Sequence, residues 1–219
     1  MKKIVSLLAW VFPSSILKLL FVKSVEGKKN FPKGNFILAA NHLSHIDWSI
    51  DGAIMTPRRY TFIAQIDKMT GVKKILRDLL YLWAGIIPVD RRDRDSKKKA
   101  LARAIGMVKS GYSLVIYPEG TRSRDGQLHA FKPGLGKICL ETGVPVVPLA
   151  HIGTYELMPP GQKFKAKKIV RMIIGKPLEF KNERELAQMM DKSSQAYYGL
   201  CTDISKKVED EVARLLREN

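Results

Sequence analysis

Short apolar runs alternate with helical patterns along most of this chain. Runs rich in β-branched and aromatic residues, bounded by Gly, Pro, Asn or Asp, predict strands over residues 36–40, 60–64, 85–89, 113–117, 146–150 and 169–174. Apolar positions spaced three and four apart predict helices over residues 48–55, 73–80, 97–109, 135–142 and about 194–217. This alternation is typical of an α/β fold in which helices flank a mainly parallel central sheet.

The first 24 residues follow a different pattern. Two apolar runs, residues 4–12 and 16–22, are separated by a break that begins at Pro13, and lysines flank both ends. A membrane-spanning helix needs about 20 largely apolar residues without such a break. We therefore expect residues 1–24 to form a short amphipathic two-helix element that binds a membrane interface, followed by one globular domain over residues 25–219. A buried helix pair and a cleaved or spanning segment are the alternatives.

The basic residues are unevenly distributed. The 219-residue chain carries a formal net charge of +17. From Glu183 onward six Lys or Arg oppose eight Asp or Glu, a net of −2, so the first 182 residues carry +19. This concentration predicts a polyanionic partner: a nucleic acid, an anionic bilayer or a phosphorylated substrate. With 45% hydrophobic and 27% charged residues, the composition excludes a disordered chain and a polytopic membrane protein.

The most reactive group of side chains lies in Asn41-His-Leu-Ser-His-Ile-Asp47, between a predicted strand and a predicted helix. An imidazole at the end of a strand, with a carboxylate close by, can remove a proton from a hydroxyl group. His42 and Asp47 meet only if the chain turns between them, with Ser44 or Asp47 capping the helix that follows. Asp47 would then hold one ring nitrogen of His42 and stabilise the imidazolium. Because no serine nucleophile is paired with His42, we expect the hydroxyl group to belong to the substrate.

Two other chemistries compete with this acid–base pair and are less well supported. His42, His45 and Asp47 could bind a metal ion, but a metal site needs further ligands, and the histidine spacing is one residue shorter than in the helical zinc motif. Cys139 could be a nucleophile, yet its apolar neighbours would raise the pKa of the thiol. We interpret Cys139 and Cys201 as reduced, apolar side chains, and we expect no metal and no cofactor.

A second candidate segment is Tyr117-Pro-Glu-Gly-Thr-Arg-Ser123, which follows the fourth predicted strand. Gly120 allows backbone conformations that other residues avoid, so that neighbouring amides and the Thr121 hydroxyl can face an anion. Arg122 adds a planar guanidinium suited to phosphate. The alternative is a surface turn in which Glu119 and Arg122 form an exposed ion pair.

Two further segments also attract attention. Gly85-Ile-Ile-Pro-Val-Asp-Arg91 is a predicted strand that ends in Arg91, and ligands of open α/β sheets bind at the carboxyl ends of strands. Arg91 is therefore a second phosphate candidate, whereas the basic run over residues 92–99 is expected to be a solvated surface that faces a membrane or a carrier. Val144-Pro-Val-Val-Pro-Leu-Ala150 is expected to be a buried core strand.

These four segments, in this order, resemble the glycerolipid acyltransferase family, in particular its bacterial 1-acyl-sn-glycerol-3-phosphate acyltransferases. Each family motif has a counterpart here, namely His42 to Asp47, Gly85 to Arg91, Pro118 to Arg122, and Val144 to Pro148. The resemblance covers about residues 35–150. One departure is Pro88, where the family more often has a larger apolar or aromatic residue.

The resemblance implies that residues 25–219 are an acyltransferase catalytic domain. It would transfer a fatty acyl group from a thioester of acyl-carrier protein or coenzyme A to the sn-2 hydroxyl of lysophosphatidic acid, giving phosphatidic acid in phospholipid biosynthesis. His42 would be the base and Asp47 its partner. The implied substrate-binding residues are Arg91, Glu119, Gly120, Thr121 and Arg122. The resemblance further implies a peripheral or monotopic protein on the cytoplasmic face of the cell inner membrane.

Other functions fit fewer of these features. The same chemistry could act on glycerol 3-phosphate or on another lysophospholipid. A basic nucleic-acid-binding protein would need a recognition helix, a zinc module or interleaved aromatic residues, and the sequence has none of these, so we expect no nucleic-acid partner. A non-catalytic protein that binds anionic lipid is a more distant alternative.

Overall fold

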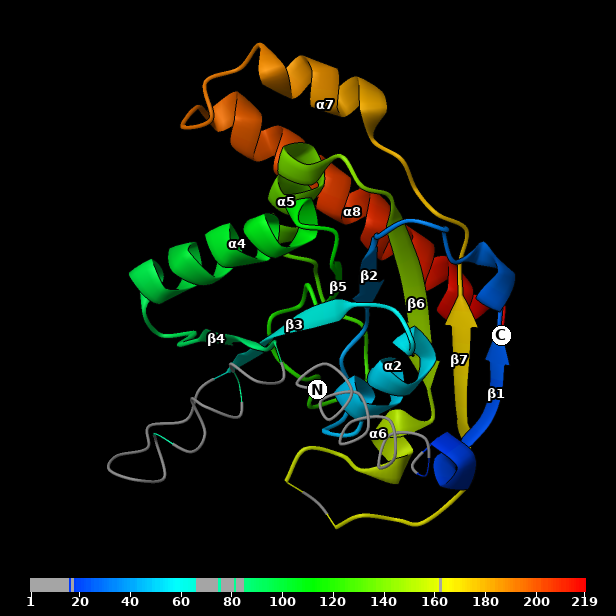
Figure 1. The fold of residues 1–219 in the computed structure, drawn as a ribbon. Helices are drawn as coiled ribbons and strands as arrows, with labels where there is room; N and C mark the ends of the chain where they lie inside the picture. Colours follow the sequence, from blue (N-terminus) through cyan, green and yellow to red (C-terminus); the bar gives the residue numbers. More distant parts are fainter. Residues whose placement is uncertain (1–15, 17, 66–74, 76–80, 82–84, 162) are drawn as a thin grey trace, which may run out of the picture.

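The computed structural model describes residues 16, 18–65, 75, 81, 85–161 and 163–219, which contain a seven-stranded sheet (Figure 1). The strands are β1 (Val22–Glu26), β2 (Ile37–Ala40), β3 (Tyr60–Gln65), β4 (Ile87–Val89), β5 (Ser113–Ile116), β6 (Val146–Ile152) and β7 (Val170–Ile174). Their order across the sheet is β1-β7-β6-β2-β5-β3-β4. Neighbouring strands are parallel except for β6 and β7. The predicted α/β fold with a mainly parallel sheet is confirmed.

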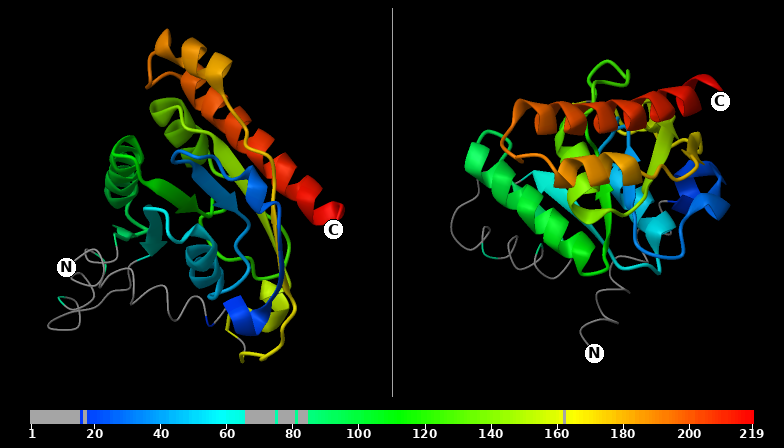
Figure 2. Two further views of the ribbon diagram at one scale, coloured as in Figure 1. Left: turned by 45° about the vertical axis from the view of Figure 1, so that its right-hand side comes forward. Right: turned by 90° about the horizontal axis from the view of Figure 1, so that it is seen from above.

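Helices cover both faces of this sheet. They are α2 (Asp47–Met55), α4 (Arg94–Lys109), α5 (Gly134–Thr142), α6 (Thr154–Leu157), α7 (Lys181–Gln188), α8 (Gln195–Arg217) and the 3-10 helix η1 (Lys28–Asn30). On one face, α4, α5 and α8 form a core with Ile37 and Ala39 of β2. On the other face, α2 packs against Leu38 and Ala40. Because side chains alternate along a strand, β2 is buried on both faces, and α7 packs beyond α5 and α8 (Figure 2).

Most predicted elements are present with shifted ends. Each predicted strand has its counterpart, although β4 begins two residues late and β6 continues to Ile152. The predicted helices over 48–55, 97–109, 135–142 and 194–217 correspond to α2, α4, α5 and α8. α5 ends at Thr142, where the predicted helix ends, and Gly143 follows it with φ 68°. α4 starts three residues early because the Asp93 side chain accepts hydrogen bonds from the amides of its first turn.

Four elements were not predicted: β1, η1, α6 and α7. β1 begins at Val22, so residues 22–24 of the segment expected to be helical are strand, and that part of the prediction was wrong. β1 pairs with β7 and forms one edge of the sheet. The remainder of the N-terminal prediction rests mainly on residues 1–15 and 17, and the predicted helix over 73–80 rests on all but residue 75, outside the described residues.

The direction of the strands decides which segments meet. β2, β3, β4, β5 and β6 run the same way, so their carboxyl ends share one edge of the sheet, which we call the carboxyl edge. β7 and β1 run the opposite way, so their starting residues lie at this same edge. Within the described ranges, no helix is both long and apolar enough to cross a bilayer.

Candidate active site

The turn between β2 and α2 brings His42 and Asp47 into contact, as the sequence predicted. Nδ1 of His42 lies 2.9 Å from Oδ2 of Asp47. The same oxygen accepts hydrogen bonds from the amides of Leu43 and Ser44, both at 2.8 Å. Asp47 is fully buried and His42 is 7% exposed. With Nδ1 held by the carboxylate, Nε2 is the ring nitrogen that can receive a proton from a substrate.

α2 begins without the side-chain cap that was expected from Ser44 or Asp47. Ile46 occupies the cap position and provides no side-chain hydrogen bond, and Asp47 is the first residue of the helix. The hydroxyl of Ser44 donates instead to the carbonyl of Met158 at 2.9 Å. The capping prediction was wrong because the Asp47 carboxylate reaches back into the preceding turn rather than forward to the helix amides.

Asp47 is ionised in spite of its burial. Burial raises the pKa of this carboxyl, but the hydrogen bond with His42, the charge of His151 and the amide of Ser44 outweigh it, and the net pKa lies below its ordinary value. An ionised acid beside Nδ1 keeps the proton of neutral His42 on that nitrogen. It also stabilises the imidazolium that forms when Nε2 takes a second proton.

The segment after β5 binds the backbone of this same turn. Oε1 of Glu119 accepts a hydrogen bond from the amide of His42 at 2.8 Å, and Oε2 accepts one from the amide of His129 at 3.3 Å. The amide of Ser123 donates to the carbonyl of His42 at 2.7 Å. Glu119 is only 3% exposed, so the alternative of an exposed Glu119–Arg122 ion pair was wrong. Burial raises the pKa of Glu119 to about 7.

The two predicted phosphate-binding arginines lie near each other. Arg91 follows β4 and its amide donates to Oε1 of Gln65 at 3.1 Å, next to β3. Burial, and then the charge of Arg122, lower the pKa of Arg91. A guanidinium that lowers the pKa of another guanidinium must be close to it. Two like charges held together at the carboxyl edge favour a bound anion, and a phosphate group matches both of them.

Gly120 and Thr121 lie at the exposed side of this arrangement. Gly120 has φ +74°, and a Cβ atom there would lie 2.5 Å from Nζ of Lys132. The amino group of Lys132 therefore lies over Gly120 and adds a positive charge to this segment. Thr121 is exposed. Sequence reasoning missed Lys132, because a single lysine outside any motif gives no signal of its own.

The metal-binding alternative for the turn involved His42, His45 and Asp47. Burial, and then the charges of Arg122 and His42, lower the pKa of His45. A positive neighbour of this kind opposes a second cation at the same place. In the parts of the chain that the structure describes, no three His, Cys, Asp or Glu side chains are grouped so that they could hold a metal ion.

A second His–Asp pair lies behind the first. The ring of Tyr117 stacks on the ring of His42, with 4.0 Å between centroids and 13° between planes. The Tyr117 hydroxyl donates to Oδ2 of Asp51 at 2.7 Å, and Oδ1 of Asp51 lies 2.7 Å from Nε2 of His151. Nδ1 of His151 lies 3.0 Å from the carbonyl oxygen of Asn41. These contacts link residues of α2 and β6 to residues that directly follow β2 and β5.

The second pair carries charge inside the core. Burial alone would lower the pKa of His151, but the Asp51 carboxylate outweighs it and raises the pKa to about 9. Both side chains are fully buried. Sequence reasoning missed this pair, although two signals were present. Asp51 follows Asp47 by four residues and so shares its helix face, and His151 directly follows the core strand predicted over 146–150.

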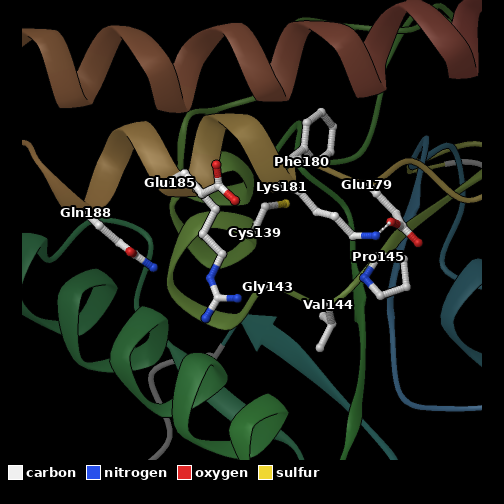
Figure 3. A pocket seen from close by; sticks show the side chains of 10 residues that line it. Cys139, Gly143, Val144, Pro145, Glu179, Phe180, Lys181, Glu185 and Gln188 are labelled. Atoms are coloured by element: carbon white, nitrogen blue, oxygen red, sulfur yellow. Dashed lines mark ion pairs between the residues drawn. The ribbon is translucent and has the colours of Figure 1, made fainter.

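The fourth sequence segment, Val144 to Ala150, begins at one edge of the sheet and continues through β6 toward the carboxyl edge. β6 is buried, as predicted, and its far end delivers His151 to the site. Its start lies at the opposite edge, where Val144 and Pro145 line a cavity of about 440 Å³ together with residues of α5 and α7 (Figure 3). Cys139 also lines this cavity, far from His42. Burial raises the pKa of the Cys139 thiol, as its apolar neighbours predicted.

Comparison with known proteins bears on this arrangement. A family model described as Acyltransferase matches residues 23–152, more than half of the chain. A chloroplastic 1-acyl-sn-glycerol-3-phosphate acyltransferase of Brassica napus is 36% identical over 161 residues, which cover 70% of this chain and 44% of the relative. A 1-acyl-sn-glycerol-3-phosphate acyltransferase of Borreliella burgdorferi is 32% identical over 134 residues, 59% of this chain and 51% of the relative.

A solved structure extends the likeness to the fold. The crystal structure of the 1-acyl-sn-glycerophosphate acyltransferase from Thermotoga maritima superposes with a TM-score of 0.70 at 30% sequence identity. The match covers 99% of this chain and 80% of that one. In contrast, the chain spans about half the length of the curated relatives it matches. The matched family region contains His42, Asp47, Arg91, Arg122 and His151.

Proposed function

This chain belongs to the acyltransferase family, and on that premise we propose that it transfers a fatty acyl group to the sn-2 hydroxyl of lysophosphatidic acid. The donor is a thioester of acyl-carrier protein or coenzyme A, and the product is phosphatidic acid. The names of the relatives in plants and bacteria support this acceptor. No cofactor takes part in the proposed reaction.

His42 is the proposed base. Its Nε2 takes the proton of the acceptor hydroxyl while the oxygen attacks the carbonyl carbon of the thioester. The new carbon–oxygen bond forms, the carbon–sulfur bond breaks, and the imidazolium returns its proton to the departing thiolate. The ring therefore ends each turnover in its starting state, and Asp47 stabilises its charged form in between.

Proton transfer is only part of the proposed rate enhancement. General base catalysis contributes about 10²–10⁴ in rate. Holding the two substrates in a reactive orientation contributes more, since effective molarities of well-oriented groups reach about 10⁵–10⁸ M. The fixed turn supports this role, because four of its backbone groups are held by hydrogen bonds. Two of these bonds join His42 to the segment after β5, and two join the amides of Leu43 and Ser44 to Asp47.

The acceptor phosphate is proposed to bind Arg91 and Arg122. Their mutual repulsion falls when a phosphate lies between them, which makes the anion-bound state the favoured one. Gly120 and Thr121 shape the pocket, and Glu119 braces it through the backbone of the catalytic turn. The observation that carries the proposal is the buried His42–Asp47 pair at the carboxyl edge, the edge where Arg91 follows β4 and Arg122 follows β5.

The cellular setting is also a proposal. We keep residues 1–21 as an interfacial membrane-binding element, without residues 22–24, which belong to β1, and we assign the chain from β1 onward to the catalytic domain. The protein would act as a peripheral or monotopic enzyme on the cytoplasmic face of the cell inner membrane. A positively charged first part of the chain supports this placement, because the lipid substrate and the product both reside in an anionic bilayer.

Product analysis tests the function directly. The full chain is incubated with either thioester donor and with lysophosphatidic acid, glycerol 3-phosphate or lysophosphatidylcholine, and products are identified by mass spectrometry. We expect phosphatidic acid from lysophosphatidic acid, and a rate at least tenfold lower with each other acceptor. His42→Ala should abolish product without changing the urea unfolding midpoint by more than a small amount. Undiminished turnover by this variant would refute the proposed base.

A further inference from the structure

A second cationic pocket lies away from the acceptor site. It has a volume of about 400 Å³ and forms between the start of β1, the residues just before it, η1, and the segment that leads into β7. Four lysines line it: Lys18, Lys23, Lys28 and Lys168. We call it the four-lysine pocket. None of its described lining residues is acidic.

The lysines of this pocket repel one another. Burial, and then the charge of Lys28, lower the pKa of Lys18, so these two amino groups are close. Glu26, the carboxylate of β1, is occupied elsewhere: it accepts hydrogen bonds from Ser24 at 3.1 Å and from Arg171 at 3.3 Å. Four positive charges around one hollow favour a ligand with more than a single negative charge.

An exposed apolar surface adjoins the pocket. Leu19, which lines it, is 69% exposed, and Leu20 is 52% exposed. Phe164 is 44% exposed and packs edge-on against Phe21 with 5.0 Å between ring centroids. Apolar side chains beside a ring of lysines match the two parts of a lipid, the acyl region and the charged headgroup.

The position of the pocket relates it to the membrane rather than to the acceptor site. The start of β1 and the start of β7 lie at the carboxyl edge, the same edge as His42, with α2 and α6 nearby (Figure 1). The pocket extends from this edge along β1 to Lys28, which follows the end of β1 at the opposite edge. Across the sheet, β1 is the first strand and β4, which carries Arg91 at its end, is the last, so one lipid could not fill both sites.

We propose that the four-lysine pocket binds the phosphate monoester headgroup of a membrane lipid, and that this contact holds the β1 side of the molecule at the bilayer. Lysines bind phosphate as point charges, so the site selects charge rather than one headgroup geometry. The exposed basic run over residues 92–99 differs from this pocket, because Asp93 and Asp95 lie among its cations.

Binding to vesicles without any acyl donor tests this proposal independently of the proposed reaction. The full chain is titrated with phosphatidylcholine vesicles that contain phosphatidic acid, or phosphatidylglycerol at matched surface charge. The pocket variant is Lys28→Ala with Lys168→Ala. The matched control is Lys29→Ala with Lys167→Ala, which removes two exposed lysines next to the same positions but outside the pocket lining.

We expect the pocket variant to bind phosphatidic acid vesicles at least tenfold more weakly than the control variant. General electrostatic attraction, worth about 1 kcal/mol per lysine near an anionic surface, is lost equally from both variants and so cancels. We also expect the wild type to prefer phosphatidic acid to phosphatidylglycerol, and the pocket variant to lose this preference. Urea unfolding verifies that both variants remain folded.

Two outcomes would overturn the proposal. Equal weakening of the two variants would show that the lysines act only as a diffuse charged surface. Binding of inorganic phosphate to the wild type and not to the pocket variant, together with equal vesicle binding by both, would assign the pocket to a free phosphate compound instead of a lipid.

Discussion

His42 with Asp47 and His151 with Asp51 are two pairs of the same residue types in different surroundings. Both aspartates lie on α2, one helical turn apart, and the histidines follow or end the neighbouring strands β2 and β6. The N–O distances are 2.9 and 2.7 Å. What differs is the second ring nitrogen. In His151 both nitrogens are within hydrogen-bond distance of protein oxygens, whereas in His42 only Nδ1 is held by its aspartate.

This difference separates a structural pair from a reactive one. A ring with both nitrogens engaged and no exposed surface cannot take a proton from a substrate, and its charge serves to hold secondary-structure elements together. A ring with one nitrogen held and the other directed away from its partner has a fixed tautomer and an available base. Tyr117 connects the two, because its ring stacks on His42 while its hydroxyl binds Asp51.

Asp47→Asn should break the reactive pair with the largest effect on activity. The amide cannot stabilise imidazolium, and its NH₂ group favours the wrong tautomer of His42. We expect kcat to fall between about 10²- and 10⁴-fold, measured by steady-state acyl transfer to lysophosphatidic acid.

The matched control is the same substitution one helical turn later. Asp51→Asn should lower kcat by less than about tenfold, because Asp51 does not contact His42 and acts on it indirectly, through Tyr117 and through the charge of His151. If the two variants lost equal activity, the distinction between the pairs would fail.

His151→Leu should break the structural pair with the largest effect on stability. It leaves the Asp51 carboxylate buried without its cation, and removing one partner of a buried ion pair costs about 3–5 kcal/mol. Urea unfolding followed by circular dichroism measures this loss. The double variant His151→Leu with Asp51→Asn should regain more than half of it, because no isolated charge remains in the core. A His151→Leu protein of wild-type stability but with kcat as low as that of Asp47→Asn would make this pair catalytic.

The reactive pair could be predicted from sequence because it is local. His42 and Asp47 lie within one turn, and the strand and helix on either side have clear apolar patterns. The same holds for the central strands, whose residues are mostly apolar. Gly143 could be predicted as the end of α5 because the backbone there adopts a positive φ that favours glycine.

The structural pair could not be predicted in this way, since it depends on which strands become neighbours. His151 reaches Asp51 across 100 residues of sequence, and nothing local to β6 indicates that contact. α7 was missed because its exposed face is charged and Ala187 is its one buried residue. β1 was missed because its start continues an apolar run that resembled a helix. Lys132 reaches Gly120 only through the folded loop.

Tyr117→Phe should separate the two contacts of Tyr117, its ring on His42 and its hydroxyl on Asp51. The ring remains on His42, but the hydrogen bond to Asp51 is lost, and hydrogen bonds to charged groups contribute about 1.5–3 kcal/mol. We expect stability to fall by about this amount in urea unfolding, with kcat within a few-fold of wild type. Tyr117→Leu also removes the ring and should lower kcat further. If the Phe variant alone abolished turnover, Tyr117 would belong to the reactive pair through its hydroxyl.

The smallest expected effect is on the pH dependence of stability, which should distinguish Glu119, next to the first pair, from His151 in the second. The folded pKa of Glu119 is raised to about 7, above its ordinary value of 4.5. The contribution of Glu119 to the free energy of unfolding is therefore fully present below about pH 4.5 and is lost as pH rises through 7. The free energy of unfolding changes by at most about 1.4 kcal/mol per pH unit in this range. The folded pKa of His151 is raised to about 9, so its contribution is present below 6.5 and is lost as pH rises through 9.

Glu119→Gln should remove the fall in stability that Glu119 causes as pH rises to about 7, and leave the fall that continues to about pH 9. His151→Leu should remove the fall at higher pH and leave the one at lower pH. Urea midpoints measured from about pH 5 to pH 9 for wild type and both variants provide the comparison. The glutamine oxygen can still accept a hydrogen bond from the amide of His42, so the catalytic turn is retained and the change isolates the titrating charge. An unchanged slope between pH 5 and pH 7 in Glu119→Gln would mean that another group titrates there, and that the buried carboxylate beneath the reactive histidine is ionised throughout.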